Sequence, residues 1–287
     1  MRQAGRVSLE LAEGRLVGEV AARAGRIGVE VSSVTPPDAL VVIDLPDLND
    51  VAGLVPIERL VVFDDRDAFR AEAALVIQPS MPTWTGSGHA GRVLAGFAYA
   101  PVAREYVDLR GVDPAAGAPE VEILVCFGGS DPALVTSRLA PIIASGESWR
   151  TTIIVGLDYA GELEGLGRGV VRDPPDLATR LARADLVVIG AGTMKFEVAC
   201  VGTPALMVAV ADDQLAVGPP FASTGAADYL GDGRTIEPDR VLAAVRALVV
   251  DAGRRARMGP VATDIVDGRG AERVAAAILE LARRAPV

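Results

Sequence analysis

The second half of the chain alternates short apolar runs with longer amphipathic segments. The apolar runs predict strands at 122–127, 151–155, 186–189, 205–210 and 227–230. The amphipathic segments predict helices from about residue 132, before 184, up to about 201, after 213, and over 238–250. Repeated alternation of strand and helix is typical of an α/β fold, in which a parallel sheet carries helices on both faces.

The last segment of the chain predicts one more helix, over 272–284. Val274, Ile278 and Leu281 fall on a single stripe of that helix, so we expect it to pack against another element. In two-domain α/β proteins such a helix often returns to the first domain, and we expect the same here.

The first half of the chain is less regular. Apolar runs ending in polar residues predict parallel strands at 40–44, 60–65 and 74–78, and 6–26 predicts one or two helices. A segment rich in Gly, Pro, Ala and Asp follows. We therefore expect a domain over 1–110, a linker over 111–119 and a second domain over 120–287, with the active site in the cleft between the domains.

Composition excludes several classes of function. The 287 residues carry a net charge of −10, which argues against nucleic acid as a partner. No apolar run approaches the roughly 18 to 20 residues that span a bilayer, and the first residues do not resemble a signal peptide, so we expect a cytoplasmic protein without a membrane span. Cys126 and Cys200 lie in apolar stretches and are expected to be buried thiols.

A Gly-rich turn after the strand at 186–189 is the strongest chemical signal. Gly190 and Gly192 allow close approach of a ligand to the backbone, and Thr193 is placed to cap the next helix. The helix end would present N–H groups to an anion, and Glu197 would lie close enough to accept hydrogen bonds from a ribose. An ordinary strand-to-helix turn is the alternative interpretation.

A second turn, after the strand at 122–127, has the same composition. Gly128, Gly129 and Ser130 form the turn, Ser130 or Asp131 would cap the next helix, and Pro132 would be its first residue. Two such turns from one sheet favour a nucleotide-phosphate site over two ordinary connections.

Two residue types occur once each. Lys195 is the only lysine, and its place on the helix after the first turn favours a solvated helix face over a ligand contact. His89 is the only histidine and lies in a turn-rich segment, which makes it a candidate for function. One histidine with no cluster of Cys or carboxylates does not make a metal site, so we expect neither a metal nor a cofactor.

An ordered set of motifs resembles a known family. The motifs are Phe-Gly-Gly-Ser-Asp-Pro at 127–132, Ala-Asp at 184–185, Gly-Ala-Gly-Thr at 190–193 with Glu197, Gly-Thr-Pro at 202–204, Asp-Gln at 213–214 and Asp-Gly-Arg-Gly-Ala-Glu-Arg at 267–273. Together they resemble the UDP-sugar hydrolase of pseudaminic acid biosynthesis, its spore-coat polysaccharide relatives and, more distantly, the lipid II-forming GlcNAc transferase. The resemblance covers roughly 38–284 and is strongest from residue 121 onward.

The resemblance implies the GT-B fold, two Rossmann-like domains with a nucleotide-sugar in the cleft between them. It implies that both Gly-rich turns face the diphosphate of UDP and that Glu197 holds the ribose. Gln214 would contact the sugar, although Asp213 replaces the Asn of the family's pair. Tyr99 matches the tyrosine of the family's hinge.

The first half departs from the family. Members of the family carry their catalytic histidine in a Gly-x-Gly-His-x-x-Arg loop near the N-terminus. We expect this loop to be missing here, from a shortened N-terminal domain. A similar sequence, Gly-Ser-Gly-His-Ala-Gly-Arg, occurs instead at 86–92. The candidate bases are therefore His89, Asp44 and Asp65. For Asp44 and Asp65, capping or solvation at a strand end is the competing interpretation.

Three functions remain open at the level of sequence. Hydrolysis of a UDP-sugar is the first interpretation, since the C-terminal motifs support it. A small GT-B glycosyltransferase that transfers the sugar to an acceptor is the alternative. A catalytically silent nucleotide-sugar-binding protein is the third. The sequence does not define the sugar, the acceptor or the oligomeric state.

Overall fold

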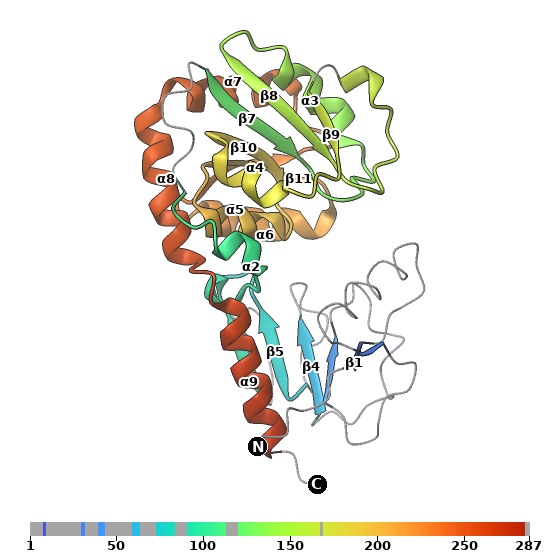
Figure 1. Ribbon diagram of the computed structural model, residues 1–287, viewed down its shortest axis with the longest axis vertical. Coiled ribbons are helices and arrows are strands. Elements are labelled where there is room, and N and C mark those ends of the chain that lie inside the picture. The colour runs from blue at the N-terminus through green and yellow to red at the C-terminus, as the bar shows by residue number, and fades with distance from the viewer. Residues whose placement is uncertain are drawn as a thin grey trace.

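The computed structural model of the chain describes residues 8–9, 30–31, 40–43, 59–63, 73–83, 91–112, 120–166 and 169–284. These residues form two main parallel sheets with their helices and a short pair of strands, and the long helix α9 (Gly270–Arg284) lies along the N-terminal sheet (Figure 1). The α/β fold with two parallel sheets, predicted from the sequence, is confirmed. The predicted domain limits stay a prediction.

The C-terminal sheet has six strands, and all neighbouring pairs are parallel. Across the sheet the order is β12 (Ala227–Asp232), β11 (Ala205–Ala209), β10 (Leu186–Gly190), β7 (Val121–Cys126), β8 (Trp149–Val155) and β9 (Val170–Arg172). Five of these strands were predicted from apolar runs. Strand β9 was not predicted, because its three residues are too few to give a pattern.

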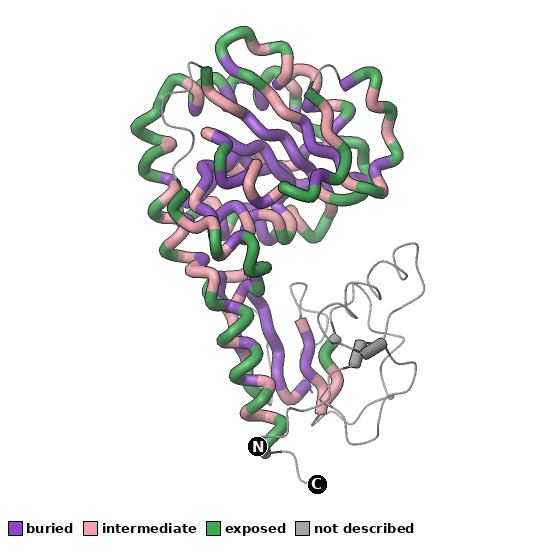
Figure 2. Tube along the Cα trace, viewed as in Figure 1, coloured by how far each residue is buried: buried purple, intermediate pink, exposed green. Residues whose placement is uncertain are grey.

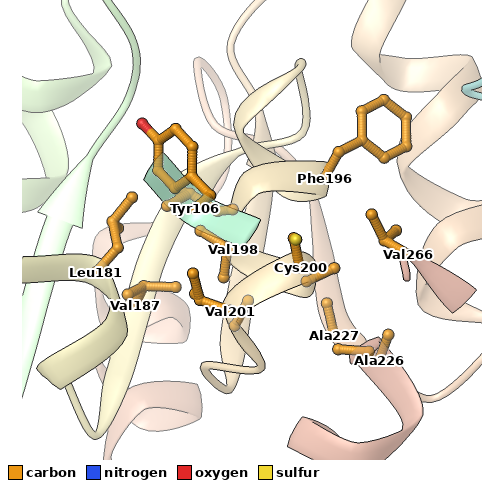
Figure 3. Close-up of a cluster of buried hydrophobic side chains, with 14 of the residues drawn as sticks. Tyr106, Leu181, Val187, Phe196, Val198, Cys200, Val201, Ala226, Ala227 and Val266 are labelled. Atoms are coloured by element: carbon orange, nitrogen blue, oxygen red, sulfur yellow. The ribbon is translucent and has the colours of Figure 1, made fainter. Parts of the chain in front are cut away.

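Helices cover both faces of this sheet. They are α3 (Val135–Ala144), α4 (Leu177–Arg183), α5 (Met194–Val201), α6 (Asp212–Ala222), α7 (Pro238–Val250) and α8 (Ala252–Ile265). Residues of α3 and α7 pack on one face, and residues of α4 and α5 pack on the other (Figure 3). All residues of β10 and β11 are buried, which explains why the central strands are continuously apolar (Figure 2).

One predicted helix boundary is wrong, and one helix was not predicted. Helix α3 begins at Val135, not near Pro132, because Asp131 and Leu134 both have positive φ angles, 40° and 54°, that interrupt helical geometry. Helix α8 was not predicted. Among the described helices, none combines the length and the apolar composition needed to cross a bilayer.

The N-terminal sheet has four parallel strands in the order β3 (Val41–Ile43), β4 (Leu60–Phe63), β5 (Leu75–Gln78) and β6 (Arg92–Ala95). The predicted strands at 40–44, 60–65 and 74–78 match β3, β4 and β5, whereas β6 was missed. Apolar residues of β4 and β5 pack with Val274 and Ala277 of α9, so the final helix completes the core of this sheet.

The helices predicted over 6–26 are wrong where the structure describes that range. Ser8–Leu9 is a short strand, β1, paired in parallel with β2 (Glu30–Val31). Pairing with a segment some twenty residues away overrode the weak local preference for helix. The other residues of 6–26 lie outside the described part of the chain.

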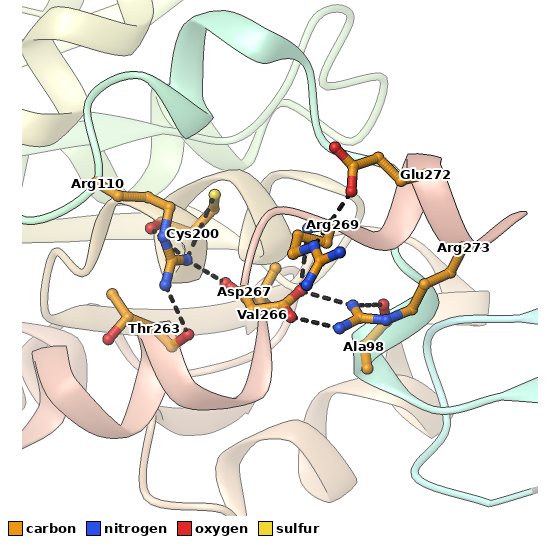
Figure 4. A network of polar contacts seen from close by, with 9 residues as sticks. All are labelled: Ala98, Arg110, Cys200, Thr263, Val266, Asp267, Arg269, Glu272 and Arg273. Carbon is orange, nitrogen blue, oxygen red and sulfur yellow. Dashed lines mark hydrogen bonds and ion pairs between the residues drawn. The ribbon is translucent and has the colours of Figure 1, made fainter. Parts of the chain in front are cut away.

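The segment joining α8 to α9 forms the joint between the two sheets (Figure 4). Arg273 donates to the Asp267 carboxylate and to the carbonyl of Ala98, so it connects the segment to the short 3-10 helix η2 (Phe97–Tyr99). This guanidinium lowers the pKa of Asp267 to about 2. Gly270 packs so closely on the backbone of Ala100 that an added Cβ would lie 2.0 Å from its carbonyl oxygen.

Arg110 also stabilises this joint, through hydrogen bonds to the ends of α5 and α8. It follows α2 (Arg104–Val107), and its guanidinium donates to the carbonyls of Cys200, Thr263 and Val266 at 3.3, 3.1 and 2.7 Å (Figure 4). These acceptors lie at or beside the C-terminal ends of α5 and α8, where carbonyls lack helical partners and the helix dipole favours a cation. The motif at 267–273 and Arg110 therefore fix the path of the chain between the sheets.

Candidate functional site

The order of strands in the C-terminal sheet places a switch point between β7 and β10. From β7 the chain continues outward through β8 and β9, and then returns to the other side of β7 to form β10, β11 and β12. Strands β7 and β10 are hydrogen-bonded neighbours, with Cys126 opposite Ile189. In open α/β sheets, ligands bind beyond the carboxyl ends of the two strands at such a switch. Both Gly-rich turns leave the sheet at this point.

The turn after β10 leaves backbone donors available at the start of α5. Thr193 occupies the N-cap position, but it has helical angles of φ −61° and ψ −31°, and its side chain makes no capping hydrogen bond. The predicted cap is therefore wrong, because a capping residue needs an extended backbone to aim its oxygen at the helix. Within the described part of the chain, the N–H groups of Gly192 and Thr193 have no hydrogen-bond acceptor. They are the best-placed anion donors of this turn.

The turn after β7 is built differently. The carboxylate of buried Asp131 accepts hydrogen bonds from the N–H groups of Val135 and Thr136, at 3.0 and 2.7 Å. Asp131 thus supplies the acceptor for the first N–H groups of α3, but the N-cap position itself is Leu134, because the helix starts three residues later than predicted. Because the carboxylate already occupies the start of α3, that helix end is closed to a phosphate. Any anion donors here belong to the loop of Gly128, with φ 106°, and the exposed Gly129 and Ser130.

Gly156 sets the position of this loop, a role that the sequence analysis missed. It follows β8, and a Cβ on it would lie 2.0 Å from the carbonyl oxygen of Gly129. Only a glycine leaves room for that approach of one backbone to another. The sequence signal was a lone glycine after an apolar run, which many ordinary turns also have.

Glu197 lies on α5 beside the carboxyl end of β7. The hydroxyl of Tyr106, a residue of α2 that is only 4 % exposed, lies near its carboxylate. Burial raises the pKa of Glu197, the nearby Glu105 adds to the rise, and the hydroxyl of Tyr106 opposes it. Burial and the Glu197 carboxylate raise the pKa of Tyr106 in turn. The carboxylate thus has a neighbour that the sequence analysis did not identify.

The two cysteines are free and buried, as predicted. Cys126 ends β7, and burial raises the pKa of its thiol to about 11, with Glu197 and Asp131 adding to the rise. Burial also raises the pKa of Cys200. Both thiols are neutral at physiological pH, which makes them poor nucleophiles and poor metal ligands.

Gln214 covers the turn after β10. Its Oε1 accepts from the N–H of Val210 at 3.1 Å, and its Nε2 lies 3.0 Å from the position that a Cβ on Gly192 would take. Asp213 is exposed on the first turn of α6. Gln214 and the Gly190 to Thr193 turn are therefore brought together by the fold.

Tyr99 occupies a different place from the other candidates. It lies in η2 and packs against the core between the N-terminal sheet and α9, near Arg273. Its predicted place on the sugar side of the ligand stays a prediction. The candidate bases His89, Asp44 and Asp65 lie outside the described residues, so their roles stay predictions.

Lys195 is buried, and the prediction of a solvated helix face is wrong. Its side chain lies inside, with the residue only 2 % exposed, and its ammonium donates to the carbonyls of Ala191 and Gly192 and to the hydroxyl of Ser80. The carbonyls of its own turn and a hydroxyl from the other half of the chain replace the water that an exposed lysine would bind.

The described residues contain no group of three or more His, Cys, Asp or Glu side chains arranged as metal ligands. A shallow groove lies at the opposite edge of the C-terminal sheet, lined by residues that include Glu122, Arg150, Asp176 and Arg180. Ion pairs join Arg150 to Glu122 and Arg180 to Asp176 across it. We place the site at the switch point instead, because there the backbone donors are available and the glycines allow approach.

Comparison with known proteins agrees with this architecture. The crystal structure of MurG from Acinetobacter baumannii superposes with a TM-score of 0.58 at 17 % identity, over 92 % of this chain and 77 % of that one. The crystal structure of the glycosyltransferase of kitacinnamycin gives a TM-score of 0.50 at 23 % identity, over 73 % of this chain and 55 % of that one. The chain has the GT-B fold.

Among curated proteins, the spore coat polysaccharide biosynthesis protein SpsG of Bacillus subtilis is 25 % identical over 170 residues. The match includes 55 % of this chain, and it spans only half the length of that relative. No protein-family model matches the chain. The resemblance to spore-coat polysaccharide proteins is thus supported at the level of sequence, while the resemblance to the pseudaminic acid hydrolase stays a prediction.

Proposed function

We propose that this protein is a glycosyltransferase-like enzyme of the GT-B fold that takes a nucleotide-sugar, with UDP as the expected nucleotide, and transfers the sugar to an acceptor. The observation that carries the proposal is the position of both Gly-rich turns at the switch point between β7 and β10. One turn there is common in α/β proteins, but two turns side by side with available N–H groups favour a diphosphate.

The residues divide the work as follows. The N–H groups of Gly192 and Thr193 and the loop of 128–130 bind the diphosphate and stabilise its charge as the bond to the sugar breaks. Glu197 accepts from the ribose hydroxyls, and Gln214 lies over the turn where the sugar would follow. No metal is needed in this scheme, because backbone donors and a helix dipole meet the leaving charge.

The base that activates the acceptor comes from the N-terminal half in this proposal. In Figure 1 the arrowheads of β4 and β5 point toward the C-terminal sheet, so the carboxyl ends of these two strands face the half that carries the Gly-rich turns. Asp65 follows β4 along the chain. His89, Asp44 and Asp65 remain the three candidates for the base.

Transfer is favoured over the hydrolysis that the sequence analysis ranked first. The curated relative is a polysaccharide biosynthesis protein, and one of the two structures with the same fold is the glycosyltransferase of kitacinnamycin. Hydrolysis uses the same donor site with water in place of the acceptor, so an experiment decides between them.

The test has two steps. Calorimetry with UDP, dTDP, GDP and ADP measures whether the protein binds a nucleoside diphosphate, with Glu197→Gln as a control expected to bind more weakly. The protein is then incubated with nucleotide-sugars, with and without a panel of sugar and polyol acceptors, and free diphosphate is assayed. Release that requires an acceptor supports transfer, and release in buffer alone supports hydrolysis. Absence of binding to every diphosphate would overturn the proposal.

A further inference from the structure

The ammonium group of Lys195 contacts three oxygens from two separate parts of the fold. It lies 3.2 Å from the carbonyl oxygen of Ala191, 3.3 Å from that of Gly192 and 3.3 Å from the hydroxyl of Ser80. It also sits 4.2 Å from the centre of the Phe196 ring. A buried ammonium needs polar partners in place of water, and two of those seen here are backbone carbonyls of a single turn.

The two carbonyls belong to the peptide units that carry the proposed phosphate donors. The carbonyl of Ala191 shares its peptide unit with the N–H of Gly192, and the carbonyl of Gly192 shares its unit with the N–H of Thr193. In a planar trans peptide the C=O and the N–H point in opposite directions. Lys195 therefore holds both units from one side and turns both N–H groups to the other side.

The third contact reaches the N-terminal half. Ser80 is buried and lies two residues beyond the end of β5, 115 residues away from Lys195 in the sequence. The Phe196 ring beside the ammonium packs in turn on Phe97 of the joint and on Phe221, with ring centres 6.5 and 6.0 Å away. The ammonium is thus fixed by contacts on both sides of the boundary between the halves.

We propose that Lys195 is a positioning residue for nucleotide binding: it orients the peptide units of Ala191 and Gly192 so that the N–H groups of Gly192 and Thr193 meet the phosphates of the ligand. The inference rests on the proposed function, because it names the device that prepares the phosphate-binding turn. Glycines at this turn permit many backbone orientations, and Lys195 selects one of them before the ligand arrives.

The test compares a phosphate-bearing ligand with one that lacks phosphates. The variant Lys195→Met keeps an unbranched side chain of nearly the same length but loses the N–H donors of the ammonium group. Affinity for whichever of UDP, dTDP, GDP and ADP binds the wild-type protein best is measured by calorimetry, and affinity for the matching nucleoside by ligand-observed NMR. We expect the diphosphate to bind at least about tenfold more weakly, because the N–H groups of Gly192 and Thr193 no longer point at the charged phosphates. Nucleoside affinity is expected to change less than about twofold.

Ser80→Ala is the matched control. It removes one contact of the ammonium and keeps both carbonyl contacts, so it is expected to weaken diphosphate binding less than Lys195→Met does. A thermal melt of each variant reports any general loss of structure, which would lower both affinities together.

The outcomes separate the two proposals. If the wild-type protein binds a diphosphate and Lys195→Met binds it equally well, or loses nucleoside and diphosphate affinity in the same proportion, the positioning role is overturned and the proposed function stands. If the wild-type protein binds no diphosphate, the proposed function fails and the inference fails with it. A selective loss for the diphosphate supports both.

Discussion

Replacing Glu197 with Gln separates a functional carboxylate from a structural one. The side chain keeps its shape, and its amide still has the hydroxyl of Tyr106 as a neighbour. What is lost is the negative charge. If the carboxylate receives the ribose hydroxyls, Glu197→Gln weakens nucleoside diphosphate binding by about 1 to 3 kcal/mol, which is about 5- to 150-fold in the dissociation constant.

The same variant has an opposite effect on stability. Burial raises the pKa of Glu197 in the folded state, so its contribution to stability is present below the unfolded pKa and is lost as the pH rises through the folded pKa. Glutamine has no such loss. Glu197→Gln is therefore expected to increase the free energy of unfolding at neutral pH. This gain is expected to vanish below about pH 3, well under the ordinary glutamate pKa of about 4.3, where the wild-type carboxyl is protonated in both states.

Calorimetry and urea unfolding at the two pH values check both effects. The ribose assignment is examined further with a 2′,3′-dideoxynucleotide, which should bind the variant and the wild-type protein equally. Tyr106→Phe serves as the control, since it removes the neighbouring hydroxyl and retains the charge. Unchanged affinity for the diphosphate would refute the ribose role, and a fall in stability at neutral pH would show that the carboxylate is mainly a structural partner.

Three further predictions concern the turns and the joint, all read by urea unfolding. Gly156→Ala places a Cβ 2.0 Å from the carbonyl oxygen of Gly129 and should cost about 2 kcal/mol or more, so a neutral result would contradict the close approach. Arg110→Met removes three bonds to helix-end carbonyls and should cost about 2 to 4 kcal/mol, whereas Arg104→Met, at an exposed ion pair, should cost less than about 1 kcal/mol. Thr193→Ala should cost less than about 0.5 kcal/mol, since no capping bond is lost. A cost above about 1 kcal/mol would show that Thr193 does cap the helix.

The sequence was most informative where structure depends on burial alone. Strands β10 and β11 are covered on both faces, so their residues are apolar without interruption, and the pattern predicted them directly. The Gly-rich turns were also evident, because glycine followed by a helix signal leaves few alternatives. The strand order, and with it the position of the turns at the switch point, needed the structure.

Prediction failed where a single backbone angle or a distant partner decides the outcome. Asp131 and Leu134 adopt positive φ angles that side-chain chemistry alone does not signal, and they delay the start of α3. Thr193 is a residue type that is common at the N-cap, but its backbone angles are helical. Lys195 was assigned to solvent because its acceptors are two carbonyls of its own turn and a serine 115 residues away.

The motifs that carry the family resemblance serve two different purposes in this fold. Those at 127–132 and 190–193 lie at the switch point, where a ligand can reach them. The motif at 267–273 lies at the joint, where Gly270 contacts the backbone of Ala100 and Arg273 ties Asp267 to η2. A fixed joint determines how the carboxyl ends of the two sheets face each other. Under the proposed function, donor and acceptor have to meet in one orientation, so the joint would act on the reaction through this geometry without touching the substrate.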